Sequence, residues 1–435
     1  MDDKRPSSPP RNQHFLVLDA WRGICACLVA LFHFSSTSHL QNLPLLRNAY
    51  LFVDFFFVLS GFVIFASYEE KLQRGFGFGR FLVLRFGRLY PLHLALFIAF
   101  VGADLLKLLP LFGGYSTYPP FTAPGETPPY IVTNLLLIQS LGVQHRLSWN
   151  DPSWSISVEF YTYVVFGIAV VLLKNRIRWL ILALLLLSPL FLAVFSSQYM
   201  NTTFQYGFIR CLFGFSAGAL CWHVFQRYQS AAAVRGSPRL WDAAEIAMLI
   251  AVAWFVTVAG SSALTLLAPL LFSATILVFS MERGLISRLL QTRVFLLLGV
   301  LSYSLYMDHM FIRRKLFVSG AMVVERLFHV SLITRVSGGE LIGTSPWQGD
   351  LLMLAYLGVL VALAYATYHW IEDPCRNWFK SLVSAPRRRS AQAPVRLTPA
   401  SARAATGFAS ARPVPPGTPA APPSLGSTAA PRSSP

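Results

Sequence analysis

The chain has 435 residues, of which 54% are hydrophobic and only 13% are charged. Soluble domains carry about 25% Asp, Glu, Lys and Arg, so this composition excludes a disordered protein and disfavours an ordinary soluble enzyme. The net charge of +17 does not indicate a partner among nucleic acids, because most of the cations lie in the basic C-terminal segment and in short segments between apolar runs, where they report membrane topology. The sequence therefore predicts a polytopic protein of the lipid bilayer.

A membrane-spanning helix needs about 20 predominantly apolar residues, and the chain offers about ten such segments. Two apolar runs are too long for one crossing, and we predict each of them as a helical hairpin, the second turning at Gly260-Ser261-Ser262. The predicted fold class is all-α, a polytopic transmembrane helix bundle of about ten spans. The expected spans are residues 15–36, 49–68, 89–109, 153–173, 179–196, 205–226, 243–260, 262–281, 294–316 and 350–372.

Lys and Arg are distributed unequally over the two sides of this topology. The side that holds the N-terminus receives 26 of them and the opposite side receives eight. Cytoplasmic loops carry the excess of positive charge, so we expect a multi-pass protein of the inner (cytoplasmic) membrane with both termini in the cytoplasm.

The expected spans divide the chain into three parts. Residues 1–14 form a cytoplasmic leader, residues 15–380 the transmembrane domain, and residues 381–435 a basic cytoplasmic tail rich in Pro, Ala and Ser. A segment of this composition cannot bury a core, so we expect the tail to be disordered. Between the spans, the longest segments opposite the cytoplasm are 110–152 and 317–349, and Ile131 to Leu141 within the first is expected to form a short re-entrant or interfacial helix.

The first expected span carries three ionisable residues that lipid should exclude, Asp19, Arg22 and His33. Such residues are costly in a membrane unless they are paired or face water, so each is a functional hypothesis. Helical spacing places all three on one face, with Arg22 toward the cytoplasmic end and His33 roughly 16 Å further along the axis. The alternative is an Asp19–Arg22 pair that only bonds neighbouring helices, together with a buried structural histidine.

The second expected span places Asp54 near its outer end, at about the depth of His33. A carboxylate that accepts the Nδ1 hydrogen of an imidazole fixes the tautomer and makes the other nitrogen a better base. We therefore expect Asp54 to lie beside His33 and to orient it.

The fourth and ninth spans bring further polar residues to the outer half of the bundle. The fourth begins PSWSISVEFYTY and carries Trp154, Ser155 and Glu159, and the ninth contains YSLYMDHMF with Asp308 and His309. Each residue taken alone fits an interfacial position. Four spans that deliver His, Asp or Glu to one depth favour a functional site.

The cytoplasmic side has a different chemistry. Arg85 and Arg88 form an RxxR motif in LRFGRLYPLH, where the third span leaves the cytoplasm, at a depth similar to that of Arg22. Guanidinium groups bind phosphates bidentately, although arginines on this side are also what the topology requires. The five cysteines form no CxxC pair and show no ligand spacing with His, so neither a metal site nor a disulfide framework is expected.

Six motifs in this order resemble those of the integral-membrane acyltransferase family called acyltransferase family three, and the resemblance covers residues 15–380. The motifs are LDAWRGICACLVALFHF, VDFFFVLSGFVI, RFGRLYPLH, SWSISVEFYTY, YSLYMDHMF and WIEDPCRNW. The resemblance implies transfer of an acyl group, often acetyl, from cytosolic acyl-CoA to a hydroxyl of an extracytoplasmic carbohydrate or glycolipid. The family's functional positions match Arg22, His33, Arg85, Arg88, Trp154, Ser155 and Glu159.

The chain departs from the family pattern at two places. Phe160 stands where a second acid often follows Glu159, and Asp308 precedes His309 where many relatives have Trp. Both departures lie on the outer side, so they affect the identity of the acceptor more than the type of reaction.

The leading hypothesis is an O-acyltransferase in which His33, oriented by Asp54 or Glu159, deprotonates the acceptor while Arg22, Arg85 and Arg88 hold the phosphates of acyl-CoA. Acyl-CoA is then a co-substrate, and no permanently bound cofactor is expected. Direct transfer and a covalent acyl-histidine intermediate remain open. The main alternative is a transporter or flippase for a glycan or lipid, because midplane charges also mark transport pathways.

Overall fold

The computed structural model describes residues 14–109, 118–235, 237–336 and 339–384. Within these ranges each of the ten expected spans coincides with an α-helix, so the predicted all-α bundle is confirmed. These helices are α1 (Leu16–His33), α3 (Phe52–Gln73), α4 (Phe78–Leu105), α7 (Ser153–Leu173), α8 (Ile177–Phe195), α9 (Gly207–Arg235), α10 (Pro238–Ala259), α11 (Ala268–Phe279), α13 (Arg293–Phe311) and α15 (Pro346–Thr367).

Within the described ranges, eight helical runs are long enough and apolar enough to cross a membrane. One of these runs, residues 153–195, contains both α7 and α8, which a short turn at Lys174–Arg176 separates. The run Ala263–Phe279, which includes α11, is apolar but shorter. The protein is therefore a multi-pass membrane protein.

Shorter elements connect and extend these helices. Two of them, η6 and η7, are π-helical and directly continue α13 and α15. The helical connections are η1 (His39–Asn42), α2 (Pro44–Arg47), η2 (Ala49–Leu51), η3 (Leu106–Leu108), α6 (Pro128–Leu135), η4 (Lys174–Arg176), η5 (Ala263–Leu267), α12 (Leu285–Leu290), η6 (Ile312–Val318), α14 (Ser319–Phe328), η7 (Tyr368–Glu372) and α16 (Asp373–Ser384), and the antiparallel strands are β1 (Ile333–Val336) and β2 (Gly339–Ile342).

Among the boundaries that differ from the expected ones, three change how the chain is divided into spans and connections. Helix α4 begins at Phe78 instead of residue 89, so the RxxR motif lies within the helix. Helix α13 continues through η6 into α14, which places helix where a loop was expected after residue 316. Helix α16 reaches Ser384, so the expected tail begins inside a helix. The remainder of the tail and nearly all of the leader lie outside the described residues, as does 110–117 of the first long segment.

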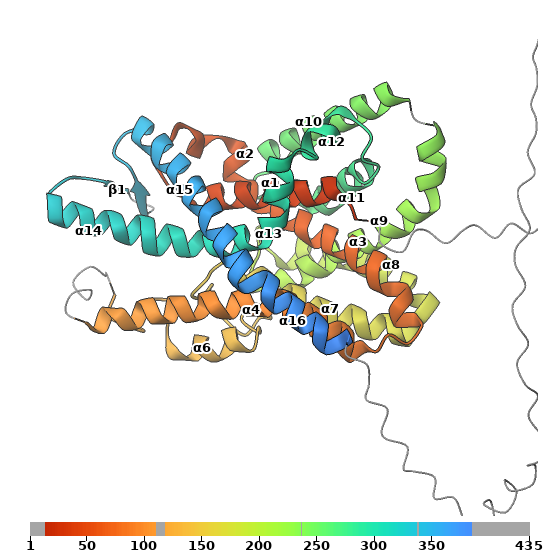
Figure 1. Ribbon diagram of the computed structural model, residues 1–435, viewed down its shortest axis with the longest axis horizontal. Coiled ribbons are helices and arrows are strands. Elements are labelled where there is room, and N and C mark those ends of the chain that lie inside the picture. The colour runs from red at the N-terminus through yellow and green to blue at the C-terminus, as the bar shows by residue number, and fades with distance from the viewer. Residues whose placement is uncertain (1–13, 110–117, 236, 337–338, 385–435) are drawn as a thin grey trace, which may run out of the picture. The chain divides into compact units, whose positions relative to one another are not determined.

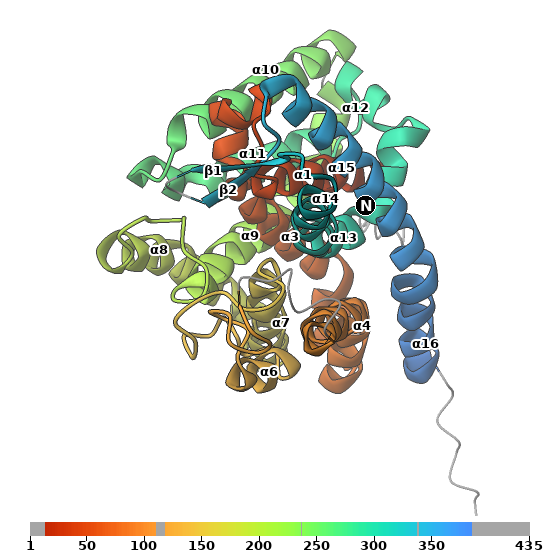
Figure 2. The ribbon, with the colours of Figure 1, turned by 90° about the vertical axis from the view of Figure 1, so that its left-hand side faces the viewer.

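Helix α1 packs mainly against α13, and both views place the two helices next to each other (Figure 1; Figure 2). The backbones approach closely because glycines face the partner helix. A side chain at Gly23 would overlap the backbone of Leu298 and Gly299, and one at Gly299 would overlap the backbone of Asp19. Small residues of this kind let membrane helices pack at short distance, and here they fix the position of α1, which carries the polar stripe.

The expected short helix within residues 131–141 exists as α6, which begins slightly earlier, at Pro128. It packs beside α4 and α7, since the Tyr90 hydroxyl of α4 donates to the carbonyl oxygen of Leu135 at 2.9 Å, and the Tyr161 hydroxyl of α7 donates to that of Leu136 at 3.2 Å. Figure 2 shows α6 next to α7.

Candidate active site

Two histidines meet at one end of the bundle, which we call the histidine end. His33 is the last residue of α1 and His309 lies near the end of α13. The His309 Nε2 atom lies 3.2 Å from Nδ1 of His33, and the two ring centroids are 4.9 Å apart. His309 is fully buried, whereas His33 is partly exposed. The packing of α1 on α13 therefore brings together two residues that the sequence separates by 276 positions.

The backbone contacts of the two rings determine their tautomers. Nδ1 of His33 lies 2.9 Å from the carbonyl oxygen of Val29, and Nδ1 of His309 lies 2.5 Å from that of Tyr306. A carbonyl oxygen only accepts hydrogen bonds, so each Nδ1 carries the hydrogen of a neutral ring. Nε2 of His309 is then an acceptor for the Nδ1 hydrogen of His33. The remaining nitrogen, Nε2 of His33, keeps its lone pair and is able to take a proton.

Ser155 is connected to the histidine pair through Tyr306. Its hydroxyl donates to the Tyr306 hydroxyl at 2.9 Å, and the carbonyl of the same tyrosine holds His309. Another tyrosine supports His309 from α15, since the Tyr356 hydroxyl donates to the His309 carbonyl oxygen at 3.1 Å. The structure thus joins Ser155 and His309 to His33 in one hydrogen-bonded group.

Arginines gather at the opposite end of α1, which we call the arginine end. Arg22 donates to Asp19 and to the Ser302 hydroxyl of α13, each at 2.8 Å. Arg88 of α4 lies within electrostatic range of both Arg22 and the buried Glu372. Within the described part of the chain the Arg88 guanidinium forms no hydrogen bond or ion pair. The Arg88 guanidinium is therefore available to bind an anionic ligand.

Arg85, three residues before Arg88 on α4, contacts a tyrosine of α3. Its guanidinium donates to the Tyr68 hydroxyl at 2.9 Å and lies 4.8 Å from the centre of the ring. The Nε atom of Arg85 is buried and has no partner among the residues that the structure describes. Arg85 is therefore held in place while part of its hydrogen-bonding capacity remains unused.

Asp54 does not orient His33, and this expectation was wrong. Both carboxylate oxygens of Asp54 accept hydrogen bonds from Arg210 of α9, each at 2.8 Å. Arg210 also donates to the carbonyl oxygens of Thr202 and Tyr50, and both charged side chains are buried. The carboxylate is saturated by a buried guanidinium, because Arg210 is the cation that α3 and α9 bring to the same depth.

Glu159 also lies away from His33. Its Oε1 atom accepts hydrogen bonds from the hydroxyls of Ser60, at 2.7 Å, and Tyr163. It lies within electrostatic range of Arg22, so it is deeper in the bundle than a residue at the outer boundary would be. The expectation that a carboxylate orients His33 therefore fails for Glu159 as well, and a backbone carbonyl and a second histidine take that place.

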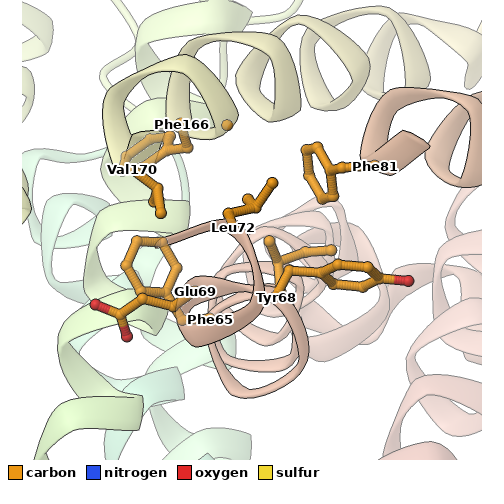
Figure 3. A pocket seen from close by; sticks show the side chains of 9 residues that line it. Phe65, Tyr68, Glu69, Leu72, Phe81, Phe166 and Val170 are labelled. Atoms are coloured by element: carbon orange, nitrogen blue, oxygen red, sulfur yellow. The ribbon is translucent and has the colours of Figure 1, made fainter. Parts of the chain in front are cut away.

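A small pocket lies between α3, α4 and α7 near the arginine end (Figure 3). Its volume of about 10 Å³ is the room for one water molecule. The rings of Phe81 and Phe166 line it, while the Tyr68 hydroxyl and the Glu69 carboxylate point away from it (Figure 3). The Glu69 carboxylate instead faces His223 of α9 at 3.1 Å. The pocket is a packing defect and holds no group that would bind a cofactor.

The described ranges contain no group of three His, Cys, Asp or Glu side chains placed to hold a metal ion. Each of the five cysteines is free.

Comparison with known proteins relates this arrangement to a family. The family model of the acyltransferase domain matches residues 15–369, which include both ends of the site. The chain belongs to this acyltransferase family. It is similar to the acyltransferase MdmB of Streptomyces mycarofaciens, with 25% identity over 79% of this chain and 85% of the relative. It is also similar to protein 2 in the picA locus of Rhizobium radiobacter, with 34% identity over 37% of this chain and 83% of that protein. No solved structure matches the chain.

Of the two departures of this acyltransferase from its family pattern, Asp308 is buried and Phe160 is partly buried. Phe160 lies against Phe86 of α4, with ring centroids 6.0 Å apart. Asp308 accepts a hydrogen bond from the Thr367 hydroxyl at 2.7 Å, and its second oxygen is buried without a partner among the described residues. Asp308 therefore connects α13 to α15 next to the histidine pair.

Trp154 has a supporting position in the acyltransferase. Its ring lies 5.3 Å from the Arg210 guanidinium and 5.8 Å from the Phe57 ring. Trp154 thus covers the buried ion pair instead of lining the histidine end.

Sequence reasoning missed two partners in this acyltransferase, Arg210 and Glu372. An arginine within an apolar span requires a buried counter-charge, and Arg210 was the available signal for the ion pair with Asp54. Glu372 belongs to the motif WIEDPCRNW and accepts from the Ser304 hydroxyl at 2.9 Å. The sequence signal for Glu372 was an acidic residue in a family motif to which no function had been assigned.

Proposed function

We propose that this acyltransferase moves an acetyl group from cytosolic acetyl-CoA to a hydroxyl of an extracytoplasmic carbohydrate or glycolipid, with His33 as the general base. The observation that carries the proposal is the Nε2 lone pair of His33, which the contacts of Nδ1 with Val29 and His309 leave available. Family membership supports acyl transfer.

In the proposed reaction, Nε2 of His33 removes the proton of the acceptor hydroxyl as its oxygen attacks the thioester carbonyl. A carbon–oxygen bond forms, the carbon–sulfur bond breaks, and the CoA thiolate leaves with the proton that His33 holds. Positive charge on the His33 ring is stabilised through its Nδ1 hydrogen by the Val29 carbonyl and by Nε2 of His309, since no carboxylate of the described residues contacts the ring. Ser155 and His309 act as positioning residues.

The donor would bind at the arginine end. Arg22, Arg85 and Arg88 supply guanidinium groups for the phosphates of acetyl-CoA, and the separation of Arg22 from His33 along α1, roughly 16 Å, leaves room for an extended thioester arm. We propose that this end faces the cytoplasm and the histidine end the outside of the inner membrane, because the excess of Lys and Arg lies on the side of Arg85 and Arg88. Both termini are then cytoplasmic.

The transporter or flippase reading loses its support once the family is known. It rested on charges within the spans, and the structure pairs the buried Asp54 with Arg210. Transport would also not require the free Nε2 lone pair that the contacts of His33 provide.

Replacing both Arg85 and Arg88 by alanine is expected to weaken the binding of acetyl-CoA. Each lost charge-assisted contact costs about 1.5–3 kcal/mol, which is about tenfold or more in affinity per arginine. Acetyl-CoA binding to the purified protein is measured by titration calorimetry. Arg74→Ala is the matched control, because Arg74 is an exposed arginine at the same end that pairs only with exposed Glu70 and should bind as the wild type does. Unchanged affinity in the double variant would reduce both arginines to topology determinants.

A further inference from the structure

The segment that precedes α7 is bound tightly to the end of α13. The Asn150 amide donates to the carbonyl oxygen of Met307 at 3.1 Å, the Tyr306 hydroxyl to that of Pro152 at 3.2 Å, and the Arg314 guanidinium to that of Trp149 at 2.7 Å. These bonds fix residues 149–152 against residues 306–314, beside the histidine pair. Side chains on the two segments therefore have defined positions relative to His33 and His309.

Most charges at this junction have partners within the described ranges. Lys107 pairs with Asp104, and Arg314 pairs with Glu126. Lys315 lies 5.7 Å from the centre of the Phe100 ring. Two side chains of opposite sign are left over, Asp151 and Arg313. Neither forms a hydrogen bond or an ion pair through its charged group with any described residue.

Arg313 lies within electrostatic range of the histidine pair. It follows His309 by four residues and lies in the π-helical η6, a geometry that is frequent at functional sites. Its charge acts on both His33 and His309. Its Nε atom is buried and has no partner in the described part of the chain. A cation so placed, with an unused buried donor, indicates a ligand that the structure does not contain.

Asp151 completes the pair from the other segment. It interacts electrostatically with Arg313, but the two groups are not joined by an ion pair. Partial burial raises the pKa of the Asp151 carboxyl, and the nearby Arg314 and Arg313 oppose that rise. A carboxylate and a guanidinium that lie within electrostatic range of each other without bonding leave their acceptors and donors available to a third group.

We propose that Asp151 and Arg313 form the acceptor subsite and that this subsite recognises a neutral, polyhydroxylated ring. The inference rests on the proposed function. Asp151 accepts from one hydroxyl of the ring and Arg313 donates to another, which positions a neighbouring hydroxyl for His33. The position of each charge selects against a like charge beside it, because a carboxylate at the ring position that faces Asp151 would be repelled, and so would an ammonium group at the position that faces Arg313.

The test compares three acceptors at saturating acetyl-CoA with the purified full-length chain. They are methyl glucoside, methyl glucuronide, and methyl glucoside that carries a trimethylammonium group in place of one hydroxyl. The quantity measured is kcat/KM for each acceptor, with the acetylated product detected by mass spectrometry. We expect the wild type to prefer the neutral glucoside by about tenfold over either charged acceptor, the size of one unfavourable charge contact near a protein surface.

The variants should change this preference in opposite directions. Asp151→Asn should remove the discrimination against the glucuronide only, and Arg313→Gln the discrimination against the ammonium glycoside only, while KM for acetyl-CoA stays unchanged. Glu340→Gln and Arg335→Gln are the controls, because they change the net charge equally and these two side chains pair with each other in the β1–β2 hairpin, so they should keep the wild-type preference. If Arg313→Gln does not fold, Arg313→Lys retains the charge and should keep the discrimination.

The possible failures are distinguishable. Equal use of the three acceptors by the wild type, or preferences that both variants leave unchanged, would overturn the subsite. Thiol release from acetyl-CoA that depends on His33, without transfer to any of the three glycosides, would also overturn the subsite but leave the proposed function standing. Absence of any acetyl-CoA turnover that depends on His33 would overturn the proposed function itself.

Discussion

His33→Ala is expected to reduce acyl transfer by about a hundredfold to ten-thousandfold, the usual contribution of a general base. The substitution removes Nε2, the one nitrogen of the histidine pair that the tautomers leave able to take a proton. Alanine fits the end of an apolar helix, so insertion and folded yield should stay close to those of the wild type. The measurement is release of free CoA thiol from acetyl-CoA in the presence of acceptor.

His369→Ala is the matched control for this prediction. His369 also bonds its Nδ1 to the carbonyl oxygen of the residue four positions earlier, at 2.8 Å from Tyr365, but it is exposed and follows α15 at the other end of the bundle. Its replacement should leave transfer unchanged. Wild-type turnover in His33→Ala, or equal losses in both variants, would end the assignment of His33 as the base.

Asp54→Asn is expected to destabilise the protein by about 3–5 kcal/mol, because it leaves the Arg210 guanidinium buried without its counter-charge. Two hydrogen bonds of 2.8 Å join the pair, and the side chains of Arg210 and Asp54 are only 1% and 0% exposed. The loss should appear as a lower midpoint of thermal unfolding in detergent and a lower folded yield. Activity per folded molecule should change far less.

The double variant Asp54→Leu/Arg210→Met separates stability from catalysis. Replacing a whole buried ion pair by apolar residues is often neutral or stabilising, so this variant should regain most of the stability that Asp54→Asn loses. It should also transfer acetyl groups. A stable Asp54→Asn protein without activity would contradict this result and return Asp54 to the catalytic group.

Much of the fold was predictable from the sequence because membrane solvent imposes a simple rule. A backbone in lipid must satisfy its own polar groups, and apolar runs of about 20 residues do so as helices, so ten apolar runs became ten helices with errors at their ends. The errors have local causes. The start of α4 at Phe78 was hidden because Arg80, Arg85 and Arg88 lower the hydropathy of a segment that is nevertheless helical. Helix α14 lies beyond the expected span because Glu325 and Arg326 lower the hydropathy of a segment that is nevertheless helical.

The partners within the site were less predictable, because hydropathy gives the depth of a residue but not its rotation about the helix. His33 and Asp54 share a depth, yet Asp54 faces α9 and His33 faces α13. That choice is made by the packing of α1 on α13 at Gly23 and Gly299 and by Arg210, which lies 156 residues away from Asp54 in sequence. The ionisable residues of α1 predicted the two ends of the site from the sequence. The side chains that contact them at each end are determined by helix packing.

The most direct test of the account follows the acetyl group across a membrane. The protein is reconstituted into sealed vesicles that contain acetyl-CoA, and methyl glucoside is supplied only outside. The account predicts acetylated glucoside in the outer solution with one free CoA thiol inside for each product molecule, and no product above background from vesicles that contain His33→Ala. Product that appears only when both substrates are on the same side, or thiol release without acetylated glucoside, would contradict it.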